Sequence, residues 1–469
     1  MNWRAVVSYG VLATASAVRG AAQSAPSPAD RQLARDIFRE LIEINTTDSL
    51  GNTPRAARAM ARRLVVAGFP AADVRVLIGP DAHHGNLVAR YRGTGTGGRP
   101  VVTLAHLDVV PARRSDWSVD PFTLLEKDGY FYGRGSTDDK VGDAILVADF
   151  IRLKRAGFKP RRDLILVLTG DEETNGNCVQ WLVSKHRALV DGEFALNTDA
   201  GGGVLREGRR VLFAVQASEK VYATFVLEAT DKGGHSSLPR PADNPIYRLA
   251  PVLERLAAYT FPLKLNEVSR AFFERSAAIE TGQLADDMRG ILRDPPDSAA
   301  VARLSAVPFY NSKLRTTCVA TMLEGGHAEN ALPQSARATV NCRILPGEPA
   351  ADVEATIRRL AADDRIAIRT TYAAIPSPPS PLTPAIMGPI ERLVAEQFPG
   401  VPIVPVMEAG ATDGLFLRNA GIPTYGVSAV FEEQNDVRAH GRDERLRVAS
   451  FYEALEFWYG MLRAYGAGE

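Results

Sequence analysis

Hydrophobic residues follow two patterns along this chain, and the first of them fills its N-terminal part. Short runs that are apolar on almost every residue alternate there with stretches in which apolar residues recur at helical spacing. Such runs are typical of strands buried on both faces, and their alternation with helices is typical of an α/β sheet. We therefore predict strands over Pro100–Ala105, Asp163–Thr169 and Phe194–Asn197, and helices over Asp30–Asn45, Gly142–Ala156 and near Val179–His186. Together they predict a mostly parallel sheet with helices on both faces.

The second pattern begins near residue 216. Over Val221–Ala229 and Arg337–Leu345, apolar residues alternate with polar ones, which indicates strands that turn one face to solvent. Amphipathic helices are expected between and after these strands, over Pro245–Tyr259 and Ala351–Ala362. This region is therefore predicted to be a separate α+β domain.

A proline-rich stretch, AAIPSPPSPLTP at 373–384, ends this second region and is typical of a stiff linker. Beyond it, helix and strand alternate again up to a final helix over Ala449–Ala464. The first domain is thus predicted in two parts, 29–215 and 375–469, with the second domain, 216–374, inserted between them.

The charge balance and the cysteine count exclude some functions and some kinds of structure. Lys plus Arg and Asp plus Glu both number 55, so no net charge draws the protein to nucleic acid, and we expect no nucleic-acid partner. The cysteines are Cys178, Cys318 and Cys342, which allow one disulfide bond at most.

Residues 1–22 have the layout of a secretory signal peptide: Arg4, a short apolar run, then small residues with cleavage after Ala17 or Ala22. The alternatives are an uncleaved anchor or a misplaced start. Because the run is short and rich in Ala and Ser, it is poorly suited to span a bilayer. We expect a secreted or periplasmic protein with no stable membrane insertion after processing.

Candidate chemistry begins where the apolar strands end. His106 and Asp108 follow the first strand in HLDVVP and, two residues apart in extended chain, point the same way. A metal-bound histidine usually donates its second ring N–H to a carboxylate or a carbonyl, a role that Asp108 suits. Taken alone, the pair is a weak signal and is better explained by an ordinary hydrogen bond at a strand end.

The stretch LTGDEETNG places Asp171, Glu172 and Glu173 shortly after a strand that is apolar throughout. Like charges this close raise one another's pKa, and a bound cation relieves that repulsion. A solvated acidic turn is the alternative, but it fits poorly with so apolar a strand. One of the adjacent glutamates can bind a metal while the other faces a metal-bound water.

Further candidates are Asp138 before a helix, Asp199 after the next strand, and His440 before the last helix. Asp138 is also explained as a helix cap, and Asp199 as part of a polar loop. Ligands of α/β sheets bind beyond the carboxyl ends of the strands, where most of these residues fall. Two histidines and three carboxylates suit zinc or a similar metal, and one bridging carboxylate would hold two ions roughly 3.5–4 Å apart.

The motifs HLDVVP, GRGSTDDK, GDEETNG, the Asp after ALNT, GGHSS and the late His together resemble the M20 metallopeptidases, from about Ala29 to about Ala464. This family includes glutamate carboxypeptidases, aminoacylases, carnosine-type dipeptidases and the carboxypeptidase S group. The resemblance implies a zinc-exopeptidase-like α/β domain with an inserted lid and dimerisation domain, and hence a homodimer. The stretch RTTCVATMLEGGHAENALP most resembles carboxypeptidase S and the N-acyl-amino-acid hydrolases.

The resemblance also implies a role for each matched residue. Asp138 would bridge two Zn²⁺ ions (Co²⁺ or Mn²⁺ being alternatives), with His106 and Asp199 at one ion and Glu173 and His440 at the other. Glu172 would be the general base, and Asp108 would orient His106. His235, often acting on a partner subunit, would stabilise the oxyanion. The substrate's carbonyl or carboxylate would contact Asn330, Arg343, Gly410, Thr412 and Asp413.

The predicted function is therefore hydrolysis of an amide next to a free carboxylate, in a small peptide or an N-acyl amino acid. A non-catalytic metal-binding or scaffold protein on the same fold is the alternative, and an aminopeptidase of the lidless class is a weaker one. The chain departs from the family pattern at Val141 and Ala411, where Gly is usual. Both changes put the substrate fit in doubt rather than the metal ligands.

Overall fold

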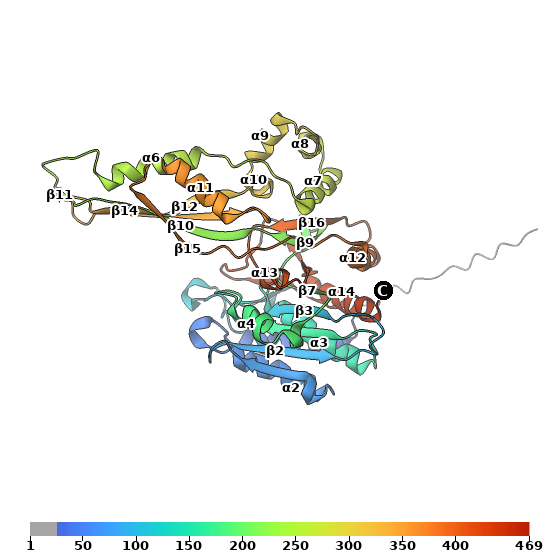
Figure 1. The fold of residues 1–469 in the computed structure, drawn as a ribbon. Coiled ribbons are helices and arrows are strands. Elements are labelled where there is room, and N and C mark those ends of the chain that lie inside the picture. The colour runs from blue at the N-terminus through green and yellow to red at the C-terminus, as the bar shows by residue number, and fades with distance from the viewer. Residues whose placement is uncertain (1–25, 469) are drawn as a thin grey trace, which may run out of the picture.

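The computed structural model describes residues 26–468. The predicted signal peptide, 1–22, lies outside the described residues. Among the described residues, none of the helices combines the length and hydrophobicity that crossing a bilayer requires. Figure 1 shows two layered parts, a main sheet with its helices and a smaller sheet that projects beyond it.

The main sheet has ten strands in the order β1-β2-β6-β3-β7-β17-β9-β8-β18, and β16 pairs with β9. Its centre, β6-β3-β7-β17, is parallel, and antiparallel pairs flank it. The strands are β1 (Val74–Ile78), β2 (Gly85–Tyr91), β3 (Val101–His106), β6 (Leu164–Thr169), β7 (Phe194–Asn197), β8 (Gly202–Arg206), β9 (Arg209–Glu219), β16 (Ile403–Glu408), β17 (Thr424–Gly426) and β18 (Phe431–Glu433).

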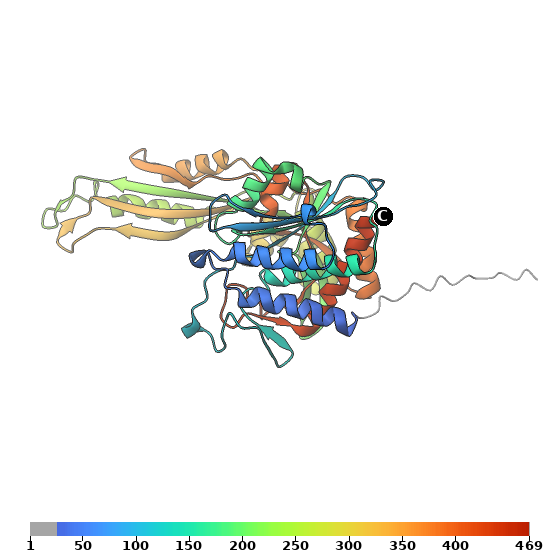
Figure 2. The ribbon, with the colours of Figure 1, turned by 90° about the horizontal axis from the view of Figure 1, so that it is seen from below.

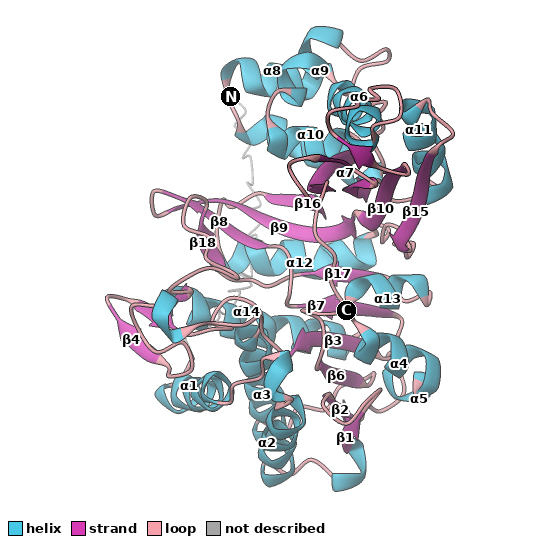
Figure 3. Ribbon diagram, turned by 90° about the vertical axis from the view of Figure 1, so that its left-hand side faces the viewer, coloured by secondary structure: helices cyan, strands magenta, loops and turns pink. Residues whose placement is uncertain are grey.

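Helices cover both faces of this sheet (Figure 3). One face packs against α1 (Pro28–Glu43), α2 (Thr53–Val66), α3 (Lys140–Arg155), α12 (Pro384–Gln397) and α14 (Val448–Ala467). The other packs against α4 (Asn177–Lys185), α5 (Arg187–Val190) and α13 (Gly414–Asn419). The sequence of β3 is apolar on almost every residue because both faces of the strand are buried. Val101 and Ala105 enter one core, and Val102 and Leu104 enter the other. The predicted α/β fold with a mostly parallel sheet is confirmed.

A short antiparallel sheet of β4 (Leu125–Lys127), β5 (Tyr130–Tyr132) and β19 (Arg445–Arg447) lies beside the main sheet. It brings the loop before α3 and the loop before α14 together, although they are far apart in sequence.

The second sheet, which we call the lid sheet, is antiparallel in the order β12-β14-β10-β15. Its strands are β10 (Val221–Thr230), β12 (Thr317–Gly325), β14 (Ser335–Ile344) and β15 (Ile366–Tyr372). The helices α6 (Pro245–Ala258) and α11 (Ala350–Ala361) cover one face with a separate hydrophobic core. A disulfide bond joins Cys318 of β12 to Cys342 of β14, two residues that face each other in register. Figure 2 shows the lid strands extending past the main sheet.

Between the lid strands the chain forms α7 (Glu267–Ile279), α8 (Gly282–Gly290), α9 (Ser298–Ser305) and α10 (Pro308–Leu314). This helical segment lies within the predicted range 216–374. Its Phe272 and Phe273 pack in one cluster with Val404 and Val406 of the main sheet. The helical segment therefore shares a core with the main sheet rather than with the lid sheet.

The chain passes between the two parts at one place. Strand β9 ends at Glu219 and β10 begins at Val221, so the chain crosses to the lid sheet almost without a linker. It returns through the proline-rich segment, where the N–H of Ser380 donates to the carbonyl of Ala217 at 2.7 Å. Outgoing and returning segments thus lie side by side at the crossing.

Candidate functional site

Polar side chains gather at the carboxyl edge of the parallel strands. His106 is the last residue of β3, Glu172 and Glu173 follow β6, and Asp199 follows β7. Since β6, β3 and β7 are adjacent and parallel, their carboxyl ends meet at one edge of the sheet. Asp138 lies in the loop between β5 and α3, and His440 in the loop between β18 and β19. Neighbouring strands thus explain why these distant segments meet.

The predicted metal ligands form one continuous cluster. His106 Nε2 lies 3.0 Å from Asp138 Oδ1 and 3.7 Å from Asp199 Oδ1. On the other side, His440 Nε2 lies 3.1 Å from Asp138 Oδ2 and 2.9 Å from Glu173 Oε2. Asp138 therefore uses one oxygen toward each histidine, which is the arrangement of a bridging carboxylate.

The donor set fits divalent cations. Ligand atoms of His106, Asp138 and Glu173 lie within 4.8 Å of one another, and so do those of His106, Glu172 and Asp199. Such mixed sets of imidazole and carboxylate suit zinc and its neighbours. Because the two sets share His106, they belong to one continuous site.

The pKa values in the cluster show how strongly its charges interact. Hydrogen bonds to Asp138 and Glu173 raise the pKa of His440 to about 10. Burial raises the pKa of Asp199 to about 7, although a hydrogen bond to His106 opposes it. Burial, and then repulsion by Asp199, raise the pKa of Glu172 well above its usual range. A cation at this place would displace the histidine proton and lower the carboxylate pKa values.

Asp108 has a wider role than the sequence suggested. His106 Nδ1 lies 3.1 Å from the backbone carbonyl of Asp108 and 3.6 Å from its carboxylate. The two carboxylate oxygens instead accept the N–H groups of Glu172 at 3.1 Å and Glu173 at 3.0 Å. Asp108 thus fixes the backbone of both glutamates while its carbonyl orients the histidine.

Glu444 is a residue of the site that sequence reasoning missed. Its fully buried carboxylate accepts hydrogen bonds from Arg134 Nη1 at 2.6 Å and from the N–H groups of Thr137 at 2.8 Å and Asp138 at 3.3 Å. It therefore fastens the Asp138 loop to the chain segment that carries His440. In the sequence HGRDERL, this glutamate looks like its charged neighbours. The one signal that could have identified it is its position four residues after His440.

Arg343 lies beside the segment that holds Gly410 and Thr412. Its Nη1 donates to the carbonyl of Ala409 at 3.1 Å, and its guanidinium carbon lies 4.7 Å from the centre of the Tyr222 ring. In the part of the chain that the structure describes, no carboxylate forms an ion pair with Arg343. Burial lowers its pKa, so the half-buried cation would gain from an anionic partner.

His235 and Asn330 lie elsewhere. They belong to the hairpin of β11 (Gly234–His235) and β13 (Ala331–Leu332), where the N–H of Ser236 donates to the carbonyl of Asn330 at 3.0 Å. Figure 1 places β11 at the far tip of the lid. Both side chains are exposed, and among the described residues neither makes a hydrogen bond or ion pair to the metal-ligand cluster.

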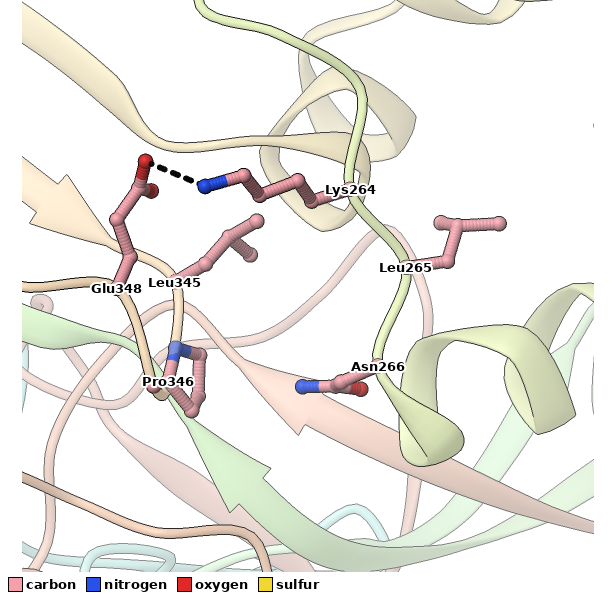
Figure 4. A pocket seen from close by; sticks show the side chains of 7 residues that line it. Lys264, Leu265, Asn266, Leu345, Pro346 and Glu348 are labelled. Carbon is pink, nitrogen blue, oxygen red and sulfur yellow. Dashed lines mark hydrogen bonds and ion pairs between the residues drawn. The ribbon is translucent and has the colours of Figure 1, made fainter.

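A cavity of about 380 Å³ lies at the junction of the lid sheet and the helical segment, away from these residues. Figure 4 shows its lining, in which Lys264 Nζ and Glu348 Oε1 lie 3.1 Å apart. It contains none of the predicted site residues. The candidate site is therefore defined by converging side chains rather than by this cavity.

The geometry agrees with comparisons to known proteins. The family model described as peptidase family M20/M25/M40 matches residues 102–464. The chain belongs to this family. The resemblance inferred from the motifs is thereby confirmed, and the protein is a hydrolase of a metal-dependent family.

Individual relatives are similar over most of the chain. The human N-fatty-acyl-amino acid synthase/hydrolase PM20D1 is 30% identical over 78% of this chain and 74% of its own length. The probable carboxypeptidase S-like 2 of Dictyostelium discoideum is 28% identical over 81% of this chain and 74% of its own. Among solved structures, the M20 metallo-carboxypeptidase Sso-CP2 of Sulfolobus solfataricus aligns with a TM-score of 0.69 at 17% identity, covering 92% of this chain and 99% of that one.

We predict that Glu444→Gln weakens metal binding 10- to 100-fold, as loss of a residue that supports a ligand commonly does. The amide would present N–H groups to backbone donors and leave Arg134 without its buried partner. Metal affinity measured by competition with a chromophoric chelator tests this, with thermal unfolding as a folding control. The matched control is Asp443→Asn, whose carboxylate accepts from Ser118 instead. Equal affinity of the Glu444 variant and the wild type would contradict the role.

Proposed function

We propose that this protein is a dinuclear zinc hydrolase that cleaves an amide next to a free carboxylate, in a small peptide or an N-acyl amino acid. The observation that carries the proposal is the convergence of His106, Asp138, Glu173, Asp199 and His440, with Glu172 beside them. Co²⁺ and Mn²⁺ would also fit these ligands. The names of the relatives, a carboxypeptidase S-like protein and an N-fatty-acyl-amino acid synthase/hydrolase, support this substrate class.

Glu172 is the general base in this proposal. Two bound divalent ions would supply Lewis acidity and a water of lowered pKa. Glu172 takes the proton of the attacking water and passes it to the leaving nitrogen, a role that its place beside the ligand cluster supports. Its backbone is held by Asp108, so the carboxylate stays beside the cluster.

Arg343 grips the free carboxylate of the substrate, together with the loop 409–412. Support comes from the half-buried guanidinium, which makes one protein hydrogen bond within residues 26–468 and so keeps most of its donors available. Guanidinium groups bind carboxylates in bidentate fashion, which also orients the scissile amide. An amino-terminal substrate would need an acidic grip instead, which disfavours an aminopeptidase.

Export is part of the proposal. The Cys318–Cys342 disulfide suits an oxidising compartment, in keeping with the predicted signal peptide. Appearance of the mature chain in the periplasm or medium, lost when residues 1–22 are deleted, would test this.

We further infer a homodimer formed along β12, with His235 reaching the partner's site. Strand β12 is an edge of the lid sheet and exposes Val319 (59%), Met322 (57%) and Leu323 (66%). An exposed apolar edge strand is a ready template for pairing with a second copy. The place of His235 at the lid tip supports action on another subunit, as an oxyanion donor with Asn330.

We predict that Glu172→Gln lowers kcat on an N-acyl amino acid by at least about 100-fold while metal content stays unchanged, because general-base catalysis contributes that much. The measurements are steady-state hydrolysis and metal analysis of the same preparation. Glu433→Gln, a change at the end of β18 where the carboxylate accepts the N–H of Gly208, is the control. Full activity of the Glu172 variant would refute its role, and inactivity of the wild type on all amides tested would favour the non-catalytic alternative.

For Arg343→Met we predict a KM about 10- to 100-fold higher for a substrate with a free carboxylate, the cost of losing a charge-assisted hydrogen-bond pair. Carboxyl-amidated substrates should be cleaved poorly by wild type and variant alike. Arg337→Met is the matched control, since Arg337 lies on the same strand but pairs with Glu228. Efficient cleavage of amidated substrates by the wild type would refute the carboxylate grip.

The dimer is tested by subunit complementation. Glu172→Gln and His235→Ala chains, each weakly active alone, should regain activity when co-expressed, because one site of the mixed dimer has both intact groups. Leu323→Arg should yield monomers in sedimentation. A monomeric wild type, or no recovery in the mixed dimer, would contradict action of His235 across subunits.

A further inference from the structure

Glu219 is a buried carboxylate at the point where the chain leaves the main sheet for the lid. It is the last residue of β9, and none of its surface is exposed. Burial of a carboxylate is costly unless its oxygens are paired. The hydrogen-bond and ion-pair partners of Glu219 therefore show which segments of the chain this residue connects.

These partners come from four separate segments. Oε1 lies 2.6 Å from Arg418 Nη1 of α13 and accepts from Ser377 Oγ of the returning linker at 3.1 Å. Oε2 accepts from Gln216 Nε2 of β9 at 3.1 Å. The same oxygen accepts both the N–H and the hydroxyl of Thr412, at 3.1 Å and 3.2 Å. One carboxylate thus fastens the loop 409–412 to the crossing.

This geometry changes how the loop can meet a substrate. The hydroxyl of Thr412 donates to Glu219 and also accepts the N–H of Gly414 at 3.1 Å, so Thr412 has no donor left for a substrate carboxylate. The N–H groups of Gly410 and Ala411, both in exposed residues, are used by no hydrogen bond within residues 26–468. Arg343 docks on the carbonyl of Ala409 at the start of the same loop.

We propose that Glu219 is a positioning residue, which acts through Thr412 to hold the loop 409–412 so that the N–H groups of Gly410 and Ala411 and the guanidinium of Arg343 converge on the substrate carboxylate. This inference rests on the proposed function and assigns Thr412 to the support of the site rather than to direct contact. Because Glu219 also binds the returning linker, it ties the carboxylate grip to the junction of lid and main sheet.

The experiment compares Glu219→Gln, Thr412→Val and Ser377→Ala on an N-acyl amino acid. Each of the first two should raise KM about tenfold, the worth of one charge-assisted hydrogen bond, with kcat within about threefold of the wild type. The double variant should be no worse than Glu219→Gln alone, because Glu219→Gln already weakens the hydrogen bond that Thr412→Val removes. Ser377→Ala, which removes only the linker's hydrogen bond to Glu219, should leave KM within about twofold.

Controls separate positioning from general destabilisation. Thr412→Ser keeps the hydroxyl, so its KM should stay near that of the wild type, unlike the KM of Thr412→Val. This comparison does not depend on whether Glu219→Gln folds well. Carboxyl-amidated substrate should show no effect of Thr412→Val, because it does not use the grip. An unchanged KM in Thr412→Val, additive effects in the double variant, or an equal rise in Ser377→Ala would each overturn the inference.

Failure of the inference and failure of the proposed function are distinguishable. If Arg343→Met raises KM while Thr412→Val does not, the carboxylate grip stands and the role of Glu219 is wrong. If the wild type cleaves no substrate with a free carboxylate, the proposed function fails and this inference fails with it.

Discussion

Repulsion between carboxylates that share one edge of a sheet is the constraint on which the rest of this structure depends. Asp138, Glu172, Glu173 and Asp199 converge within a few ångströms, and their only nearby cationic partners among the described residues are two histidines. Burial and mutual repulsion raise the pKa values of Glu172 and Asp199. Such a cluster is costly unless cations are bound, which is in keeping with a family of metal-dependent hydrolases.

Holding the ligands requires polar groups that are themselves fixed. Asp108 binds the backbone of both glutamates, and Glu444 binds the loop of Asp138. In each case a buried carboxylate accepts N–H groups of another segment, which supplies negative charge where backbone donors would otherwise lack partners. These supports connect loops from distant parts of the chain around the site.

The lid meets the main sheet through a junction of the same kind. Glu219 joins the outgoing strand, the returning linker and the loop beside Arg343. The helical segment between the lid strands packs on β16, which adds a second contact between the inserted region and the main sheet. The proposed carboxylate grip therefore lies at the contact between the two parts of the molecule.

The sequence by itself determined the α/β class, the inserted second sheet and the candidate ligands. Continuous apolar strands and alternating strands differ in periodicity, and His106, Asp138, Glu173, Asp199 and His440 stand at element ends in motifs with a known order. Their grouping at one sheet edge followed from the rule that parallel strands share a carboxyl edge.

Only the tertiary structure decided the supports and the partners. Glu219 and Glu444 resemble any other glutamate in the sequence, because their importance lies in donors contributed by segments far along the chain. The pairing of Cys318 with Cys342 and the packing of α7 on β16 likewise depend on which strands become neighbours. The local sequence pattern reflects how each helix or strand is buried. Long-range hydrogen bonds form only once the helices and strands lie next to one another.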